Sequence, residues 1–106
     1  MEIKTTDVFD KSLSKLYKKD KLLLDTIEDL VKELKINPNI GINLGNHRYK
    51  IRLKNSTNNK GKSGGYRVIT YTKIEDTILF VYIYSKSKIE NIIEQKIDKI
   101  ISNYLN

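Results

Sequence analysis

Three basic side chains in the middle of the chain have the types and spacing to bind a phosphodiester. Lys50 and Arg52 alternate with apolar residues in the segment YKIRL, and Arg67 lies in the later segment KGKSGGYRVI. In a strand, alternate side chains share one face about 7 Å apart, so Lys50 and Arg52 point the same way. If the two segments pair, Arg67 stands beside them. Lys86, at the end of the next apolar segment, then adds a fourth charge.

Four fixed cations on one face suit the cleavage of RNA by its own 2′-hydroxyl. Negative charge builds on the non-bridging phosphate oxygens in the transition state, and preorganised Arg and Lys complement it. Arg is suited to bidentate phosphate contact and Lys to a point charge or proton transfer. No general base is obvious, because an unperturbed Lys titrates at about pH 10.4. The same alternation is also typical of a solvated strand face.

Positive charge is concentrated around these residues. Between Leu34 and Ile74 there are nine Lys or Arg and no Asp or Glu, whereas the other 65 residues carry 11 bases and 13 acids, so the middle makes the formal charge of +7. Such a distribution indicates a footprint for a polyanion. Lysines in Gly-rich stretches also serve solubility, and strand tyrosines also serve as core. We expect further RNA contacts from these residues: Arg48, Lys54, Lys60, Lys62, Tyr66 and Lys88.

Composition excludes several other functions. A chain of 106 residues has room for one domain, which we expect to span residues 1–106. Without Cys, and with His47 as the one histidine, we expect no metal and no other cofactor. We also expect no contact with a membrane and a cytoplasmic location, because no apolar run approaches the roughly 20 residues of a span and the first residues do not resemble a signal peptide.

The flanking segments predict the elements that position these cations. Asp7 is expected to cap a first helix, and residues 21–36 form a second amphipathic stripe that ends at Pro38. Residues 2–5 are a possible edge strand, and residues 39–46 are expected to be a loop.

Three strands and a last helix follow. Residues 48–54 and 66–72 alternate, with Arg67 on the face opposite Tyr66, and residues 77–84 are apolar on both faces, as in a central strand covered on two sides. Ser87 and Glu90 have the spacing of a capping box before a C-terminal amphipathic helix. The fold class is therefore α+β: a helical hairpin packed on a three- to four-stranded, mainly antiparallel sheet, with a C-terminal helix.

The order of these motifs resembles a known family. A helical hairpin, then YKIRL, KGKSGGYRVI, an apolar strand that ends in IYSK, and a helix are similar to the RelE/ParE superfamily of bacterial toxins, most closely its HigB-like, RelE-type branch. The resemblance covers nearly the whole chain. It implies a ribosome-dependent endonuclease that cleaves mRNA in the A site of the 30S ribosomal subunit, in contact with mRNA and ribosomal RNA. It also implies a cognate antitoxin, which charge complementarity predicts to be acidic.

The resemblance also implies roles for single residues. Lys50 and Arg52 match the paired basic residues of the family, one a candidate base and one a transition-state stabiliser. Arg67 matches a phosphate-stabilising arginine, and Lys86 matches a basic position near the end of the last strand. Some members have an arginine directly after that lysine and an aromatic residue about six positions later, where this chain has Ser87 and Ile93.

The sequence is also compatible with two other functions. A ParE-like toxin would poison a topoisomerase without cleaving RNA, although Lys50, Arg52 and Arg67 together favour the nuclease. A non-catalytic RNA-binding module would need only the basic middle.

Overall fold

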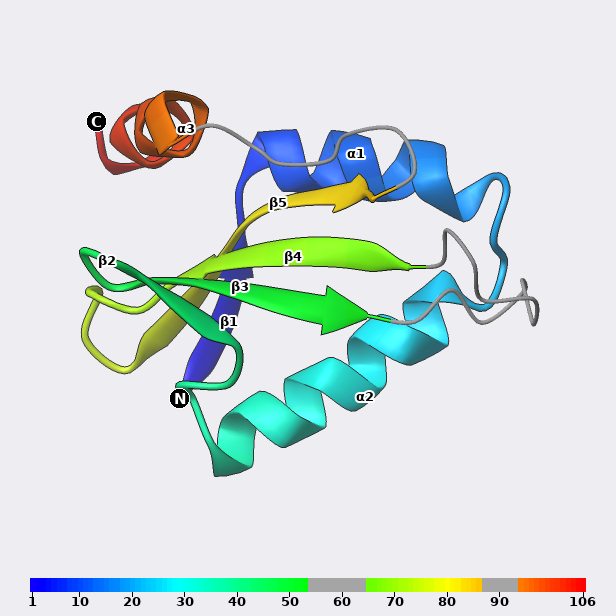
Figure 1. Ribbon diagram of the computed structural model, residues 1–106, viewed down its shortest axis with the longest axis horizontal. Helices are drawn as coiled ribbons and strands as arrows, with labels where there is room; N and C mark the ends of the chain where they lie inside the picture. Colours follow the sequence, from blue (N-terminus) through cyan, green and yellow to red (C-terminus); the bar gives the residue numbers. More distant parts are fainter. Residues whose placement is uncertain (54–64, 87–93) are drawn as a thin grey trace.

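The computed structural model describes residues 1–53, 65–86 and 94–106. Within these ranges, three helices surround one five-stranded sheet (Figure 1). In chain order the elements are β1 (Glu2–Thr5), α1 (Asp7–Tyr17), α2 (Leu23–Ile36), β2 (Ile42–Gly45), β3 (Arg48–Leu53), β4 (Tyr66–Tyr71), β5 (Thr77–Ser85) and α3 (Glu94–Leu105). None of the described helices is long and apolar enough to cross a membrane.

The sheet has the strand order β1-β5-β4-β3-β2. β1 runs parallel to β5, and all other neighbours are antiparallel. The α+β class, the helical hairpin, the three-stranded meander and the N-terminal edge strand are confirmed. The predicted total of three to four strands was too low, because residues 39–46 contain β2, a fifth strand, instead of being all loop.

The physical reason for the missed strand lies in its turn. Asn46 and His47 both have left-handed backbones, with φ of 52° and 65°, and Gly45 pairs with Arg48 on either side of them. This is the pattern of a two-residue hairpin of type I′, whose usual sequence signal is Asn-Gly. Here His takes the Gly position. The short strand also shifts register between Asn43 and Gly45, so it shows no regular alternation.

One face of the sheet is covered by α1 and α2. The helices contribute Phe9, Leu30 and Leu34 to a buried cluster with Val68 and Phe80 from the strands. The rings of Phe9 and Phe80 lie 5.2 Å apart between centroids. This packing buries the apolar stripes that the sequence predicts for the helical hairpin.

The other face is covered by α3, which Figure 1 shows across the strands from α2. Ile97, Ile100 and Ile101 pack with Ile69 and Leu79 in a second buried cluster. β5 contributes to both clusters, so the prediction of a central strand covered on two sides is confirmed. Glu94 and Asp98 on the first turns of α3 also pair with Arg48, so the helix covers one cation of this face.

The N-cap of the first helix lies one residue earlier than expected. Thr6, not Asp7, is the N-cap: its Oγ1 accepts a hydrogen bond from the Phe9 amide at 2.9 Å and donates one to the Val81 carbonyl at 2.7 Å. Thr6 therefore caps α1 and also ties it to β5. The capping box expected at Ser87 and Glu90 lies outside the described residues.

Candidate nucleic-acid interface

Three rows of side chains cross the sheet face on which α3 packs. We name each row after its β3 residue, since residues 48, 50 and 52 share one face of that strand. The Arg48 row is Arg48, Tyr71 and Leu79; the Lys50 row is Lys50, Ile69 and Tyr82; the Arg52 row is Arg52, Arg67 and Tyr84. The structure thus brings Lys50, Arg52 and Arg67 together on one face, in the arrangement that the sequence predicted.

The Arg52 row places two cations directly opposite each other. Arg52 and Arg67 are register partners on adjacent antiparallel strands, where Cβ atoms lie about 5 Å apart. Like charges in this position destabilise a sheet. Arg52 is exposed, whereas Arg67 is only 6% exposed, and among the described residues its guanidinium makes one hydrogen bond, from Nη1 to the Tyr66 carbonyl at 3.2 Å. An anion held between the two guanidinium groups would remove the repulsion.

The Lys50 row adds an amine and an aromatic surface. Lys50 is half-buried, and Tyr82 stacks on Tyr84 with ring centroids 5.8 Å apart. Lys96 of α3 places its Nζ 4.6 Å from the centre of the Tyr82 ring and 3.4 Å from Tyr82 Oη. No pattern in the sequence singles out Lys96, because its proximity to this row depends on how α3 crosses the sheet.

Lys86 lies at the same end of the sheet as the Arg52 row. It follows the last residue of β5, its side chain is exposed, and its amide donates a hydrogen bond to the Gly65 carbonyl at 3.2 Å. Tyr66 pairs with Ser85 next to it. The backbone therefore holds Lys86 beside Gly65, two residues before Arg67.

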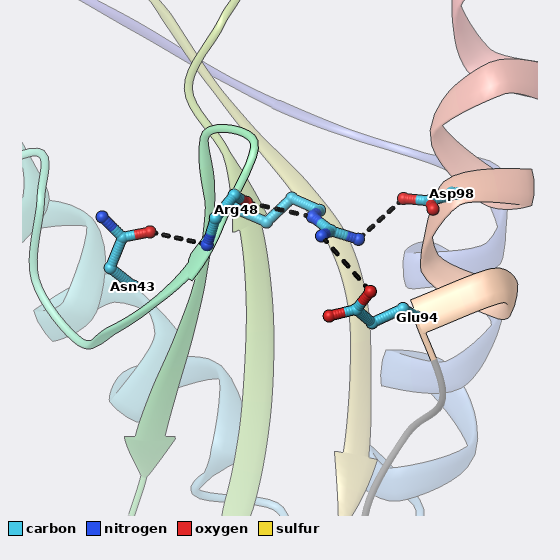
Figure 2. A network of polar contacts seen from close by, with 5 residues as sticks. Asn43, Arg48, Glu94 and Asp98 are labelled. Atoms are coloured by element: carbon cyan, nitrogen blue, oxygen red, sulfur yellow. Dashed lines mark hydrogen bonds and ion pairs between the residues drawn. The ribbon is translucent and has the colours of Figure 1, made fainter.

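Arg48 does not belong to the exposed cationic face, and this corrects the expectation that it contacts RNA. Its side chain is 3% exposed and ion-paired with α3 (Figure 2): Nη1 lies 2.7 Å from Asp98 Oδ1 and Nη2 lies 3.8 Å from Glu94 Oε2. Nε donates to the Gly45 carbonyl at 3.1 Å, and the Gly45 amide donates to Asn43 Oδ1 at 2.7 Å. Arg48 is thus committed to holding α3 and the β2–β3 turn.

Tyr66 is a second correction. Its ring is buried at 4% exposure on the face that α1 and α2 cover, and its Oη donates a hydrogen bond to Asp20 Oδ2 at 2.9 Å. Burial, and then the hydrogen bond and the negative charge of Asp20, raise the pKa of Tyr66 to about 12. A ring in this position has no face free to stack on a base. The four remaining expected contacts lie outside the described residues: Lys54, Lys60, Lys62 and Lys88.

A further group of cations was missed at the turn between α1 and α2. Lys18, Lys19 and Lys21 are exposed, while Asp20 between them is buried. Because Asp20 is bonded to Tyr66, this turn lies near the start of β4, as Figure 1 shows. Five Lys and one Asp within residues 11–21 were the available signal. This cluster was overlooked because the net charge was counted over both flanks together, where Asp and Glu residues elsewhere balance these lysines.

Histidine and acidic side chains give no metal centre in the part of the chain that the structure describes: no group of three could hold an ion there. His47 is exposed in the β2–β3 turn and lines a hollow of about 470 Å³ with Arg48, Lys73 and Asp98. This hollow lies beside the Arg48 row. His47 is therefore separated along β3 from the Arg52 row.

The sequence of this small α+β domain matches one protein-family model. Residues 1–104 match the family described as the RelE toxin of the RelE/RelB toxin–antitoxin system. The chain therefore belongs to this family, as the toxin component of a toxin–antitoxin module, and an antitoxin partner is implied. Toxins of the family are generally endoribonucleases. A search of curated proteins found no match.

Proposed function

We propose that this toxin is a ribosome-dependent mRNA endonuclease that cleaves its substrate in the A site of the 30S subunit. The direct pairing of Arg52 with Arg67 across adjacent strands is the observation that carries this proposal. Sheet stability disfavours that pairing, and a phosphodiester between the two guanidinium groups would compensate it. Membership of the RelE toxin family also supports RNA cleavage. Assignment to the HigB-like branch stays a prediction.

The proposed reaction uses the 2′-hydroxyl of the substrate. Its oxygen attacks the adjacent phosphorus, the bond from phosphorus to the 5′-oxygen breaks, and the products are a 2′,3′-cyclic phosphate and a 5′-hydroxyl. Arg52 and Arg67 stabilise the charge on the non-bridging oxygens. Lys50, in the next row, is the candidate group to take the 2′ proton or to add a charge, and Lys86 is the candidate donor to the leaving oxygen.

The surrounding cations have a simpler proposed role. Lys96 beside Tyr82, and the turn lysines Lys18, Lys19 and Lys21 at the end of the sheet where β4 begins, add exposed positive charge. Such charges contribute affinity for phosphate backbones without sequence selectivity. Both messenger and ribosomal RNA fit this surface, whereas the acidic antitoxin would compete for it.

Primer extension on cellular mRNA after brief induction tests the proposal. The wild-type toxin should produce cuts inside translated frames, and Arg67→Ala and Arg52→Ala should remove them, since loss of one charge-stabilising group costs roughly 10²- to 10³-fold in rate. Both variants should still bind the antitoxin. Growth arrest without cuts, accompanied by DNA damage, would instead support the topoisomerase poison. Partial loss of RNA affinity, with no cuts by the wild type, would support a pure binder.

A further inference from the structure

A buried hydrogen bond joins the α1–α2 turn to the strand that carries Arg67. Tyr66 Oη donates to Asp20 Oδ2 at 2.9 Å, and the two residues are 4% and 1% exposed. The bond spans 46 positions in sequence. It is made at the first residue of β4, on the sheet face opposite the cationic rows.

Stability alone does not explain this pair. Burying a carboxylate carries a desolvation cost, and replacing buried polar pairs with apolar residues of similar volume is often neutral or stabilising. Asp20 has one conventional role, because its Oδ1 accepts the Leu22 amide at 3.1 Å before α2. That role does not require a hydroxyl on the neighbouring ring. A phenylalanine at position 66 would fill the same core space without a polar group.

The position of the pair indicates what it does. Tyr66 and Arg67 are consecutive, so their side chains leave β4 on opposite faces. The Tyr66 carbonyl is also the acceptor for Arg67 Nη1, at 3.2 Å. Any movement of the Tyr66 backbone therefore moves both the Cα of Arg67 and one hydrogen bond that orients its guanidinium. With a pKa raised to about 12 by burial and by Asp20, the Tyr66 hydroxyl remains a donor at neutral pH.

We propose that Asp20 and Tyr66 are positioning residues for Arg67. Their hydrogen bond fixes the start of β4 to the α1–α2 turn and so holds the Arg67 guanidinium opposite Arg52 for the phosphate. This inference rests on the proposed function, because the readout is RNA cleavage. Neither residue touches the substrate, and the effect of each passes through Arg67.

A double-mutant cycle on cleavage tests the inference. Single-turnover cleavage of mRNA on programmed ribosomes is measured for the wild type, Tyr66→Phe, Arg67→Ala and the double variant. Tyr66→Phe should lower the cleavage rate roughly 10- to 100-fold, as expected for a misplaced catalytic group, with unchanged affinity for the ribosome. In the Arg67→Ala background the same change should alter the rate less than about twofold, because interacting residues are not additive.

Controls separate positioning from general loss of stability. Leu34→Val removes one methylene from the core at the far end of α2, and it should lower the melting temperature while leaving cleavage unchanged. Asp20→Ala should reproduce the effect of Tyr66→Phe on cleavage. A wild-type rate for Tyr66→Phe, or an equal rate loss in both Arg67 backgrounds, would overturn the inference. Full cleavage by Arg67→Ala, or none by the wild type, would instead overturn the proposed function.

Discussion

Arg48 and Arg52 lie on the same face of the same strand, four residues apart, in opposite surroundings. Arg48 is buried and holds Asp98 and Glu94 of α3. Arg52 is exposed and faces another arginine, Arg67. The difference comes from α3, which brings carboxylates to the Arg48 row. A basic strand thus divides into a cation that stabilises the fold and a cation available to a ligand.

Replacing the buried arginine should have the largest effect on stability. Arg48→Ala removes a buried side chain with its ion pairs and its bond to Gly45, which should lower the free energy of unfolding by about 2 kcal/mol. Denaturant unfolding measures this effect. Arg48→Lys, which keeps the charge without the planar fork, should recover only part of it. An unchanged midpoint for Arg48→Ala would show that α3 is held by its apolar face alone.

Alkaline pH should weaken the other end of the sheet, where Tyr66 begins β4 beside the Arg52 row. The pKa of Tyr66 is raised to about 12 in the folded protein by burial and by Asp20, against about 10 in the unfolded chain. A raised pKa contributes stability that is complete below the unfolded value, so this contribution should be lost between pH 10 and 12. Denaturant unfolding across this range measures it.

The control for this pH dependence is Tyr66→Phe. The other tyrosines remain in that variant, so any alkaline loss that it retains belongs to them. A wild-type profile that matches the Tyr66→Phe profile would contradict the assignment.

The two acids that hold Arg48 should differ from each other. Asp98 makes a 2.7 Å charged hydrogen bond, so Asp98→Asn should cost about 1 kcal/mol even though the carboxylate is 63% exposed. Glu94 is 3.8 Å away and 70% exposed, and Glu94→Gln should cost no more than a few tenths of a kcal/mol. Thermal unfolding at low and high salt distinguishes them. Equal losses of stability in the two variants would mean that the Arg48 guanidinium binds both carboxylates equally strongly.

The smallest stability effect is expected at Arg52. Because like charges are opposed across the strands, Arg52→Ala should leave the free energy of unfolding unchanged or raise it by up to about 0.5 kcal/mol. Arg52→Lys, which keeps the repulsion, is the matched control. A loss above about 1 kcal/mol would show that Arg52 has a structural partner and would remove the contrast with Arg48.

The elements that make this contrast were predicted with uneven success. Alternation in residues 48–54 and 66–72 predicted the two strands and the shared face of Lys50, Arg52 and Arg67, since a period of two fixes which side chains share a face. Alternation does not say what covers a face. Arg48 was therefore assigned to RNA, although Glu94 and Asp98, four residues apart beside an apolar helical stripe, were available as its partners.

The prediction that Tyr66 contacts RNA was wrong for a different reason. The same alternation placed it on the face opposite Arg67, so a role in RNA binding conflicted with the predicted strand. Asp20 as its partner was not predictable, because the bond spans the α1–α2 turn and the sheet. β2 was missed since its turn uses Asn46 and His47 where Gly is usual. The partner of Tyr66 thus depended on long-range packing, whereas β2 depended on a local turn with an unusual sequence.

Cleavage by two variants of β3 would separate the arginine that stabilises the fold from the arginine that is available to a ligand. Arg48→Ala and Arg52→Ala would be compared in single-turnover cleavage of mRNA on programmed ribosomes, at a temperature where both are fully folded. We expect Arg52→Ala to lose roughly 10²- to 10³-fold in rate, whereas Arg48→Ala should remain within about twofold of the wild type. Full cleavage by Arg52→Ala, or loss of cleavage by a folded Arg48→Ala, would contradict this expectation.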